Sequence, residues 1–304
     1  MKKRLFVTGL SGFVGQHIQS RLNAKASEWE LLPAASRYDL GNPDSLKDLW
    51  PELPDAVIHL AGQTFVPEAF RDPARTLNIN LLGTLNLLQA LKARGFKGTF
   101  LYVSSGDVYG QVSEAQLPIT ELQPPCPRNP YAVSKLSAEF LSLQWGLSED
   151  WPVLVARPFN HIGTGQKDSF VIASAARQIN RIKQGLQAPQ LEVGDIDVSR
   201  DFLDVGDVIS AYLALLEKGT PGQVYNICSG REQSIRSLIE QLGDLAQVDM
   251  QLIQDPARLR RADQRRVCGS HAKLAQTTGW TPEITTQQSL RAILSDWEKR
   301  VRQE

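Results

Sequence analysis

A tyrosine and a lysine stand four residues apart in the stretch YAVSK, residues 131–135, which follows the proline-rich run PPCPRNP. Four residues make about one turn of an α-helix, so a helix that begins at Pro130 places the Tyr131 phenol and the Lys135 ammonium on one face. An unperturbed tyrosine has a pKa of about 10, and a neighbouring cation lowers it. The pair therefore predicts a group that exchanges protons, although a solvated surface pair has the same spacing.

Two serines end the apolar stretch GTFLYVSS, which has the composition of a buried strand. Because doubly wound sheets bind their ligands at the carboxyl ends of the strands, Ser105, Gly106 and Asp107 are candidates for substrate contact. We expect Ser105 to orient a carbonyl oxygen and Tyr131 to donate the proton. We expect Lys135 to lower the pKa of the tyrosine and to bind the nicotinamide ribose. These three residues are predicted to be catalytic.

Three glycines with the spacing GxxGxxG separate the apolar stretch RLFVT from a helical pattern. Glycine allows a tight turn, a close approach of pyrophosphate to backbone N–H groups, and close packing of helix on strand. A plain strand-to-helix turn is the alternative, but the position of the triplet in the first connection of a repeated pattern favours dinucleotide binding. The expected contacts come from residues of this turn: Gly9, Ser11, Gly12, Phe13, Val14 and Gly15.

The charge at the end of the second strand distinguishes the two nicotinamide cofactors. We expect this strand to end near Ser36 and Arg37, where an arginine suits a 2′-phosphate and an acidic residue suits a free hydroxyl. Arg37 therefore favours NADPH, with a surface arginine as the alternative, while Asp39 leaves use of NADH open. His59 ends a buried strand and is expected to be a core residue. Further predicted cofactor contacts are Leu40, Leu60, Ala61, Gly62, Tyr131, Lys135 and Pro158.

Strand-like and helix-like patterns alternate over the first half of the chain. Apolar stretches such as DAVIHLAG and WPVLVARP are separated by helical patterns, of which TLNINLLGTLNLLQALKARG is the longest. This alternation predicts an α/β fold with a Rossmann-type doubly wound parallel sheet. It stops after Pro158, and we expect a smaller C-terminal substrate-binding region there. The predicted domains are residues 1–157 with about 202–228 for the cofactor, and about 158–201 with 229–304 for the substrate.

The composition excludes several classes of partner. Lysine plus arginine equals aspartate plus glutamate, at 33 each among 304 residues, so no net charge attracts nucleic acid or an anionic membrane. No apolar run is long enough to cross a bilayer, and the N-terminus turns to glycine too soon for a signal peptide. The three cysteines are scattered and lack metal-ligand spacing. We expect a soluble cytoplasmic protein that binds a small molecule and no metal.

Four motifs occur in a fixed order along the chain: TGLSGFVG, HLAG, SSGDVYG and PYAVSK. Their order and separations resemble the extended short-chain dehydrogenase/reductase family, which acts on nucleotide sugars, and the resemblance covers nearly the whole chain. The stretches RPFNHIGTGQKDSFV and GDIDVSRDFLDV are similar to the branch that reduces the C4 ketone of GDP-4-dehydro-6-deoxy-D-mannose. The resemblance implies that reaction, with GDP-D-rhamnose as the product. It also implies a homodimer, because relatives commonly pair two long helices from each subunit.

Two positions distinguish this chain from other members of the family it resembles. The 4,6-dehydratases carry a glutamate base where this chain has Asp107, whose shorter side chain weakens elimination. The enzyme that both epimerises and reduces its GDP-sugar has a cysteine at Asp107 and a histidine at the place of Gly165. A simple ketone reductase needs neither group, and Asp107 is then either a substrate contact or a loop cap. A dehydratase or 4-epimerase with tightly bound cofactor is the alternative, and a non-catalytic dinucleotide sensor is more remote because Tyr131 and Lys135 are both present.

A nucleotide-sugar substrate requires polar and basic contacts. Asn160 and Arg200 are candidates, since a guanidinium binds phosphate oxygens in a fork, whereas His161 is expected to be a packed neighbour. The run ARLRRADQRR is either a solvated face or a contact to the nucleotide. In the family an arginine at the matching place meets the nucleotide, which implies Arg261 first, followed by Arg258, Arg260 and Arg265.

Overall fold

Six parallel strands form the central sheet of the computed structural model, which describes residues 2–24, 27–258 and 264–304. The strand order is β2-β1-β3-β4-β5-β9, so the chain winds outward from β1 in both directions, as the alternating pattern predicts. The strands are β1 (Lys3–Thr8), β2 (Trp29–Leu31), β3 (Ala56–His59), β4 (Thr99–Val103), β5 (Val153–Pro158) and β9 (Val224–Ile227).

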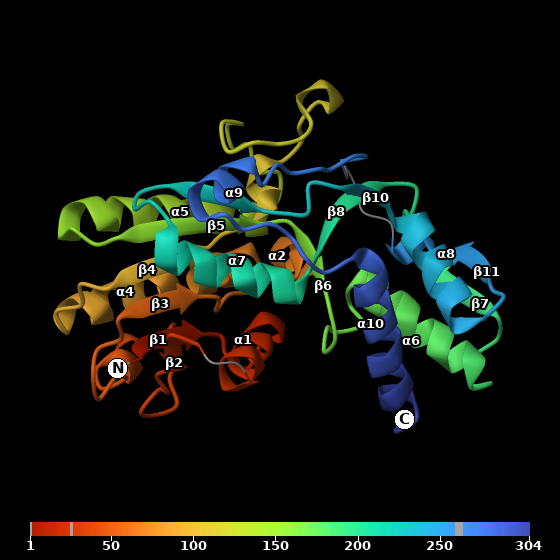
Figure 1. The fold of residues 1–304 in the computed structure, drawn as a ribbon, viewed down its shortest axis with the longest axis horizontal. Helices are drawn as coiled ribbons and strands as arrows, with labels where there is room; N and C mark the ends of the chain where they lie inside the picture. Colours follow the sequence, from red (N-terminus) through yellow and green to blue (C-terminus); the bar gives the residue numbers. More distant parts are fainter. Residues whose placement is uncertain (1, 25–26, 259–263) are drawn as a thin grey trace.

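Helices cover both faces of this sheet (Figure 1). One face carries α1 (Phe13–Ala24), α7 (Val205–Lys218) and α9 (Ala272–Thr278), and the other carries α2 (Val66–Arg71), α3 (Pro73–Leu77), α4 (Gly83–Ala93) and α5 (Pro130–Glu149). Strand side chains alternate between the two layers, so Ile58 and Leu101 pack with α1 and α7 while Val57 and Phe100 pack with α4 and α5. No helix within the described ranges is both long and apolar enough to cross a membrane.

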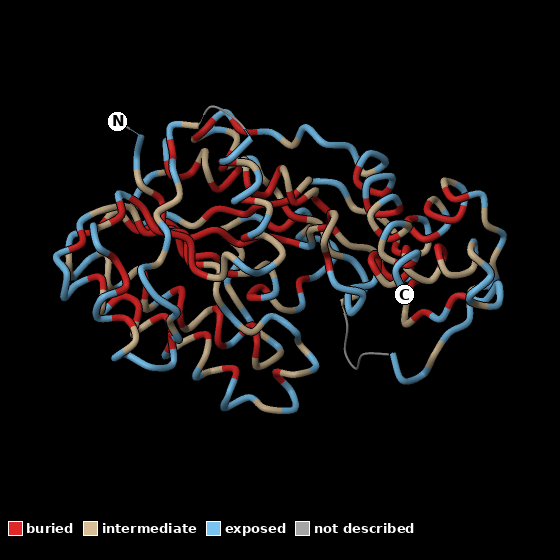
Figure 2. The backbone as a smooth tube through the Cα atoms, turned by 90° about the horizontal axis from the view of Figure 1, so that it is seen from below, coloured by how far each residue is buried: buried red, intermediate tan, exposed pale blue. Residues whose placement is uncertain are grey.

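A second hydrophobic core lies at the other end of the molecule (Figure 1). It is built from α6 (Val171–Lys183), α8 (Ile235–Ala246) and α10 (Thr286–Val301). Five short strands accompany these helices: β6 (Asn160–Ile162), β7 (Gln190–Val193), β8 (Ser199–Asp204), β10 (Glu232–Ser234) and β11 (Gln251–Gln254). After β8 the chain returns to the large sheet through α7 and β9. Figure 2 shows buried segments concentrated in the central strands and exposed residues along the outer loops.

The second strand is shorter than the sequence predicts. β2 ends at Leu31 and not near Ser36 or Arg37. Pro33 follows two residues later and has no amide hydrogen with which to continue the ladder. Arg37 is therefore an exposed residue of the loop after the strand.

The long helix predicted from TLNINLLGTLNLL is interrupted. α3 leads into a π-helical turn over Asn78–Leu82, and α4 follows directly. The turn places Asn80 in the interior, where it is 2% exposed. Such turns break the regular helical register and often occur at functional sites.

Candidate active site

The local sequence fixes where α5 begins. The side chain of Asn129 accepts a hydrogen bond from the Ala132 amide at 2.7 Å, and Pro130 occupies the first helical position. Both residue types are favoured at these places of a helix N-terminus. Tyr131 therefore lies in the first turn and Lys135 one turn later, at 9% and 5% exposure. The two side chains are buried and do not form a solvated surface pair.

Ser105 lies beside this helix, at the end of β4. It caps a short 3₁₀ helix that starts at Gly106, and its hydroxyl accepts the Asp107 amide at 3.1 Å. A hydrogen bond also joins the Ser105 side chain to the phenol of Tyr131. A Cβ on Gly106 would lie 3.2 Å from the Phe159 ring, so the loops after β4 and β5 pack closely. The structure brings the serine and the phenol of the predicted set into contact.

The electrostatics of the tyrosine differ from the prediction. Burial and the charge of Asp107 raise the pKa of Tyr131, and the hydrogen bond with Ser105 offsets this only in part. Burial lowers the pKa of Lys135 to about 7, against the opposing charge of Glu139. The expected lowering of the tyrosine pKa by the lysine is therefore wrong, because desolvation dominates both groups. A raised pKa keeps the phenol protonated at neutral pH, which suits a proton donor.

The glycine turn has the shape of a dinucleotide cradle. Gly9 has φ +73°, and a Cβ on it would lie 3.0 Å from the Ala61 nitrogen. A Cβ on Gly15 would lie 2.4 Å from the Gly9 carbonyl oxygen, to which the Gly12 amide donates at 2.9 Å. α1 begins at Phe13, so the unpaired N–H groups of its first turn face the cradle. Ser11 and Gly12 are exposed, whereas Phe13 and Val14 are half-buried.

The loop after β2 lies against this glycine turn. The Tyr38 hydroxyl forms a hydrogen bond with the backbone of Gly9, and Arg37 is exposed directly before it. The Asp39 carboxylate accepts the amide of Gly41 at 2.9 Å and so caps its own turn. Leu40 is buried next to this turn. Arg37 is therefore exposed beside the residue that contacts the glycine turn, and its contact with a 2′-phosphate stays a prediction.

Asn80 is a residue of the site that the motifs do not reveal. Its Oδ1 accepts the Gln63 amide at 2.7 Å, and its Nδ2 donates to the Gln63 carbonyl at 3.0 Å and to Ser134 Oγ at 2.8 Å. It therefore ties the loop after β3, with the predicted contacts Leu60, Ala61 and Gly62, to the first turns of α5. A Cβ on Gly62 would lie 2.9 Å from Asn80 Oδ1. The sequence shows only an asparagine inside an apolar helical pattern, and its burial appears in the structure.

Both histidines near the site have structural contacts, as predicted. His59 lies between Thr8 Oγ1 at 2.6 Å and Thr84 Oγ1 at 2.9 Å, and burial lowers its pKa to about 3. His161 stacks on Phe13 with ring centroids 6.0 Å apart and an interplanar angle of 1°. Burial also lowers the pKa of His161. Neither ring is placed as a proton donor.

The candidate substrate residues of the second region share one small sheet. Asn160 is exposed at the start of β6 and pairs with Phe202 of β8, two residues after Arg200. Arg200 donates to the Ser199 carbonyl at 2.8 Å. Gly165 forms a turn with φ +84°, and its amide donates to Asp296 Oδ2 at 2.9 Å. These positions follow β5, whose last residue, Pro158, is buried.

Part of the basic run forms ion pairs on the surface. Arg260 and Arg261, which the resemblance implies for the nucleotide, lie outside the described residues. Within the described part, each arginine of the run meets at least one carboxylate: Arg258 with Glu192 at 2.9 Å, Arg265 with Asp195 at 2.7 Å, and Arg266 with Glu232 at 2.7 Å. For these three side chains, the structure shows a surface ion-pair network.

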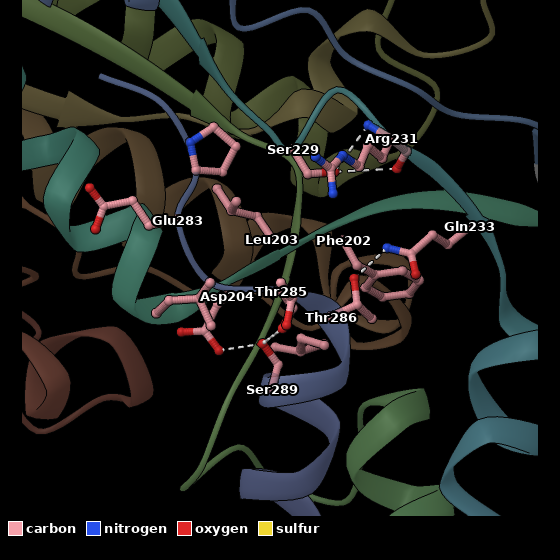
Figure 3. Close-up of a pocket in the computed structure, with 13 residues that line it drawn as sticks. Phe202, Leu203, Asp204, Ser229, Arg231, Gln233, Glu283, Thr285, Thr286 and Ser289 are labelled. Atoms are coloured by element: carbon pink, nitrogen blue, oxygen red, sulfur yellow. Dashed lines mark hydrogen bonds between the residues drawn. The ribbon is translucent and has the colours of Figure 1, made fainter. Parts of the chain in front are cut away.

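A pocket of about 90 Å³ lies between β8, the turn after β9 and the start of α10 (Figure 3). None of its 13 lining residues is a predicted site residue. Its polar groups pair with one another, Ser289 Oγ with Asp204 at 2.6 Å and Gln233 with Thr286 at 2.8 Å. The pocket is therefore polar, and neither Ser105 nor Tyr131 lines it.

Comparison with known proteins places this geometry in a family. The family model described as GDP-mannose 4,6 dehydratase matches residues 33–293. The chain belongs to this family. Its members are extended short-chain dehydrogenases/reductases that act on nucleotide sugars, which is the family that the four ordered motifs indicate.

Relatives within the family match over the full length of the chain. GDP-6-deoxy-D-mannose reductase of Pseudomonas aeruginosa is 76% identical over 304 residues, which cover 100% of both chains. GDP-6-deoxy-D-talose 4-dehydrogenase of Aggregatibacter actinomycetemcomitans is 29% identical over 300 residues and covers 97% of each chain.

Solved structures of the family have the same fold. The structure of RMD from Pseudomonas aeruginosa complexed with NADPH has a TM-score of 0.96 and 75% identity, and covers 98% of this chain and 100% of its own. UDP-glucose 4-epimerase from Thermotoga maritima with UDP-glucose has a TM-score of 0.85 and 26% identity, and covers 99% and 100%. The Rossmann-type fold is confirmed.

Proposed function

We propose that this chain is an NADPH-dependent reductase that converts the C4 ketone of GDP-4-dehydro-6-deoxy-D-mannose to the alcohol of GDP-D-rhamnose. The observation that carries the proposal is 76% identity with GDP-6-deoxy-D-mannose reductase over the whole chain. The contact of Ser105 with a buried, protonated Tyr131 supports it, because ketone reduction needs one proton donor and an oriented oxygen.

The residues of the site have distinct roles in this reaction. NADPH supplies the hydride when it is bound, and the glycine turn, Arg37 and Lys135 are the groups that would hold it. The Ser105 hydroxyl orients the ketone oxygen by a hydrogen bond. Tyr131 donates its phenolic proton to that oxygen, and its raised pKa keeps the proton in place until the oxygen becomes basic. Lys135 stabilises the phenolate that remains.

The two hydrophobic cores support different binding roles for two parts of the chain. We propose that residues 1–157 with about 202–228 hold the cofactor, and that about 158–201 with 229–304 hold the nucleotide sugar. The glycine turn belongs to the first set, and Asn160 and Arg200 belong to the second. Arg260 and Arg261 remain candidates for the diphosphate.

A stoichiometric assay separates this function from its alternative. A reductase consumes one NADPH for each ketone, whereas a dehydratase or 4-epimerase with bound cofactor recycles it. Purified protein is mixed with GDP-4-dehydro-6-deoxy-D-mannose and NADPH, and the nicotinamide absorbance band is followed. We expect it to fall in proportion to the ketone added. An unchanged band with converted sugar would favour the alternative.

Arg37 is expected to determine the preference for NADPH over NADH. Replacing it with serine should weaken NADPH binding by about 10- to 100-fold, the effect of losing a charge-assisted contact of about 1.5–3 kcal/mol. Binding of NADH should change by less than about threefold, since it has no 2′-phosphate. Fluorescence titration of both cofactors measures this, with Arg94→Ser, an exposed arginine after α4, as the control. Equal losses for the two cofactors would remove Arg37 from the site.

An apolar stripe on α5 supports a homodimer. Val133, Phe140 and Leu147 are 40%, 58% and 88% exposed and are spaced by seven residues, so they share one face of the helix. Exposed apolar side chains gathered on one face are typical of a protein interface. We propose that a second copy of the chain covers this face.

Replacing Phe140 with glutamate should therefore convert the dimer to a monomer, because it puts a charge in the centre of the stripe. Light scattering after size-exclusion chromatography measures the mass. Ile253→Glu is the matched control, since Ile253 is 38% exposed on β11 in the other region. A wild-type protein that is already monomeric at micromolar concentration would contradict the proposal.

A further inference from the structure

A buried ion pair lies directly behind the catalytic lysine. The side chains of Glu139 and Arg157 are 1% and 5% exposed. The guanidinium meets both carboxylate oxygens, with Nη2 2.5 Å from Oε1 and Nε 3.1 Å from Oε2. An apolar pair of similar size is often as stable as a buried ion pair, because two charges lose their hydration. Stability of the fold therefore does not explain why this pair is present.

Glu139 is placed to act on Lys135. Tyr131, Lys135 and Glu139 follow one another at intervals of four residues and form one buried row along α5. The charge of the Glu139 carboxylate favours the protonated form of Lys135 and so opposes the effect of burial on the pKa of that lysine. Without it, the buried ammonium loses its counter-charge on the helix.

Among the described residues, the aromatic and histidine side chains next to Lys135 carry no charge at neutral pH. Tyr102 of β4 lies under the ammonium, with its ring centroid 4.7 Å from Nζ, and burial raises the pKa of its phenol. His59 of β3 interacts electrostatically with Lys135, and burial lowers the pKa of that imidazole to about 3. Tyr131 is also neutral, since its pKa is raised. In the described part of the chain, the charge that acts on Lys135 is thus Glu139, with Arg157 of β5 behind it, while Asp107 acts on the neighbouring Tyr131.

Arg157 reaches the turn of the catalytic serine. Its guanidinium lies 4.8 Å from the centroid of the Tyr109 ring. Tyr109 is the last residue of the 3₁₀ helix that Ser105 caps, and its hydroxyl donates to Asn226 Oδ1 at 2.7 Å. The ion pair therefore bridges α5, which carries Tyr131 and Lys135, to the turn that carries Ser105.

We propose that Glu139 and Arg157 are positioning residues of this reductase, an inference that rests on the function proposed above. The Glu139 carboxylate keeps Lys135 protonated and in place. The Arg157 guanidinium holds that carboxylate with two hydrogen bonds. Through its contact with the Tyr109 ring, it also keeps the Ser105 turn in place against α5. The pair sets the distance between the group that orients the ketone and the groups that protonate it.

The direct test is a titration of Lys135 in the Glu139→Gln variant. Glutamine still accepts a hydrogen bond from Arg157 but has no charge, so we expect the pKa of Lys135 to fall by about one unit. The side-chain resonance of Lys135 in ¹³C-lysine-labelled protein reports it, assigned by its loss in Lys135→Met. This readout needs no substrate, so it stands even if the substrate is a different nucleotide sugar. Glu149→Gln is the matched control, since Glu149 pairs with Lys92 at 2.5 Å at the far end of the same helix.

Activity and stability measurements complete the test. We expect kcat to fall about 10- to 100-fold in Glu139→Gln, because small misplacements of catalytic groups cost rates of this order. The basic limb of the pH profile of kcat/KM should move to lower pH, since Lys135 loses its proton earlier. The double variant Glu139→Met, Arg157→Met should unfold at or above the wild-type temperature and show the same loss of kcat. Wild-type kcat in the double variant, or an unchanged Lys135 titration in Glu139→Gln, would overturn the proposal.

Discussion

Replacing Tyr131 with phenylalanine is expected to reduce the rate of NADPH oxidation by about 10²- to 10⁴-fold, the range of a general acid. The phenol is the proton donor of the proposed reaction, and its hydrogen bond with Ser105 aligns it with the ketone oxygen. Phenylalanine has the same ring without the hydroxyl, so the packing of the first turn of α5 is retained. Binding of NADPH should change by less than about threefold.

Single-turnover absorbance and fluorescence titration of NADPH separate the two effects. Tyr225→Phe is the matched control, because Tyr225 is a buried tyrosine of β9 whose hydroxyl accepts a hydrogen bond from the amide of Thr220 at 3.0 Å. It should retain wild-type turnover. A Tyr131→Phe variant that keeps more than about a tenth of the wild-type rate would require a different proton donor.

Replacing Lys135 with methionine is expected to reduce turnover strongly and to stabilise the protein at neutral pH. The lysine is buried, and its pKa falls from 10.5 to about 7 in the folded protein. Between these two pH values the unfolded chain binds more protons than the folded chain, so the wild-type stability rises with pH. At and below about pH 7 Lys135 is charged in the folded protein too, so the full free-energy penalty of burying an ammonium lowers the stability of the fold.

Methionine removes that cost while it fills the same space. The unfolding temperature of Lys135→Met without cofactor should therefore exceed that of the wild type at pH 7, and the difference should vanish as the pH approaches 10.5. Differential scanning calorimetry over this pH range measures it, and kcat/KM should fall by at least about 10²-fold. A lower unfolding temperature for the variant at pH 7 would show that the ammonium is not desolvated.

The parts of the site that are encoded locally could be predicted from the sequence. Asn129 and Pro130 define the start of α5, and the spacing within YAVSK then determines that the phenol and the ammonium share a face. The end of the same helix is not determined by the local sequence. Gly146 suggests a stop, but α5 continues to Glu149 and the glycine packs against β5, where a Cβ would lie 2.8 Å from Val153 Cγ2. A glycine can end a helix or lie inside one, and the tertiary packing determines which of the two occurs.

The parts that depend on burial or on distant contacts could not be predicted. The pKa of Tyr131 is raised because the ring is desolvated and Asp107 is nearby, whereas the spacing of the motif suggests only the effect of the lysine. Asn80 reaches the site through a π-helical turn that the apolar periodicity does not reveal. The pairing of Glu139 with Arg157 joins α5 to β5, and the packing of the helix on the sheet decides which of their residues meet. Such contacts belong to the tertiary structure and leave little local signal.

Transfer of deuterium from NADPH that carries deuterium at both C4 positions of its nicotinamide tests the central claim most directly. The labelled cofactor is incubated with the protein and GDP-4-dehydro-6-deoxy-D-mannose, and the sugar is examined by NMR and mass spectrometry. We predict one deuterium at C4 of the sugar for each NADPH consumed, and a rate of transfer in Tyr131→Phe that is lower by about 10²- to 10⁴-fold. Converted sugar that carries no deuterium, with both labels still on the recovered NADPH, or label at another sugar carbon, would contradict the account.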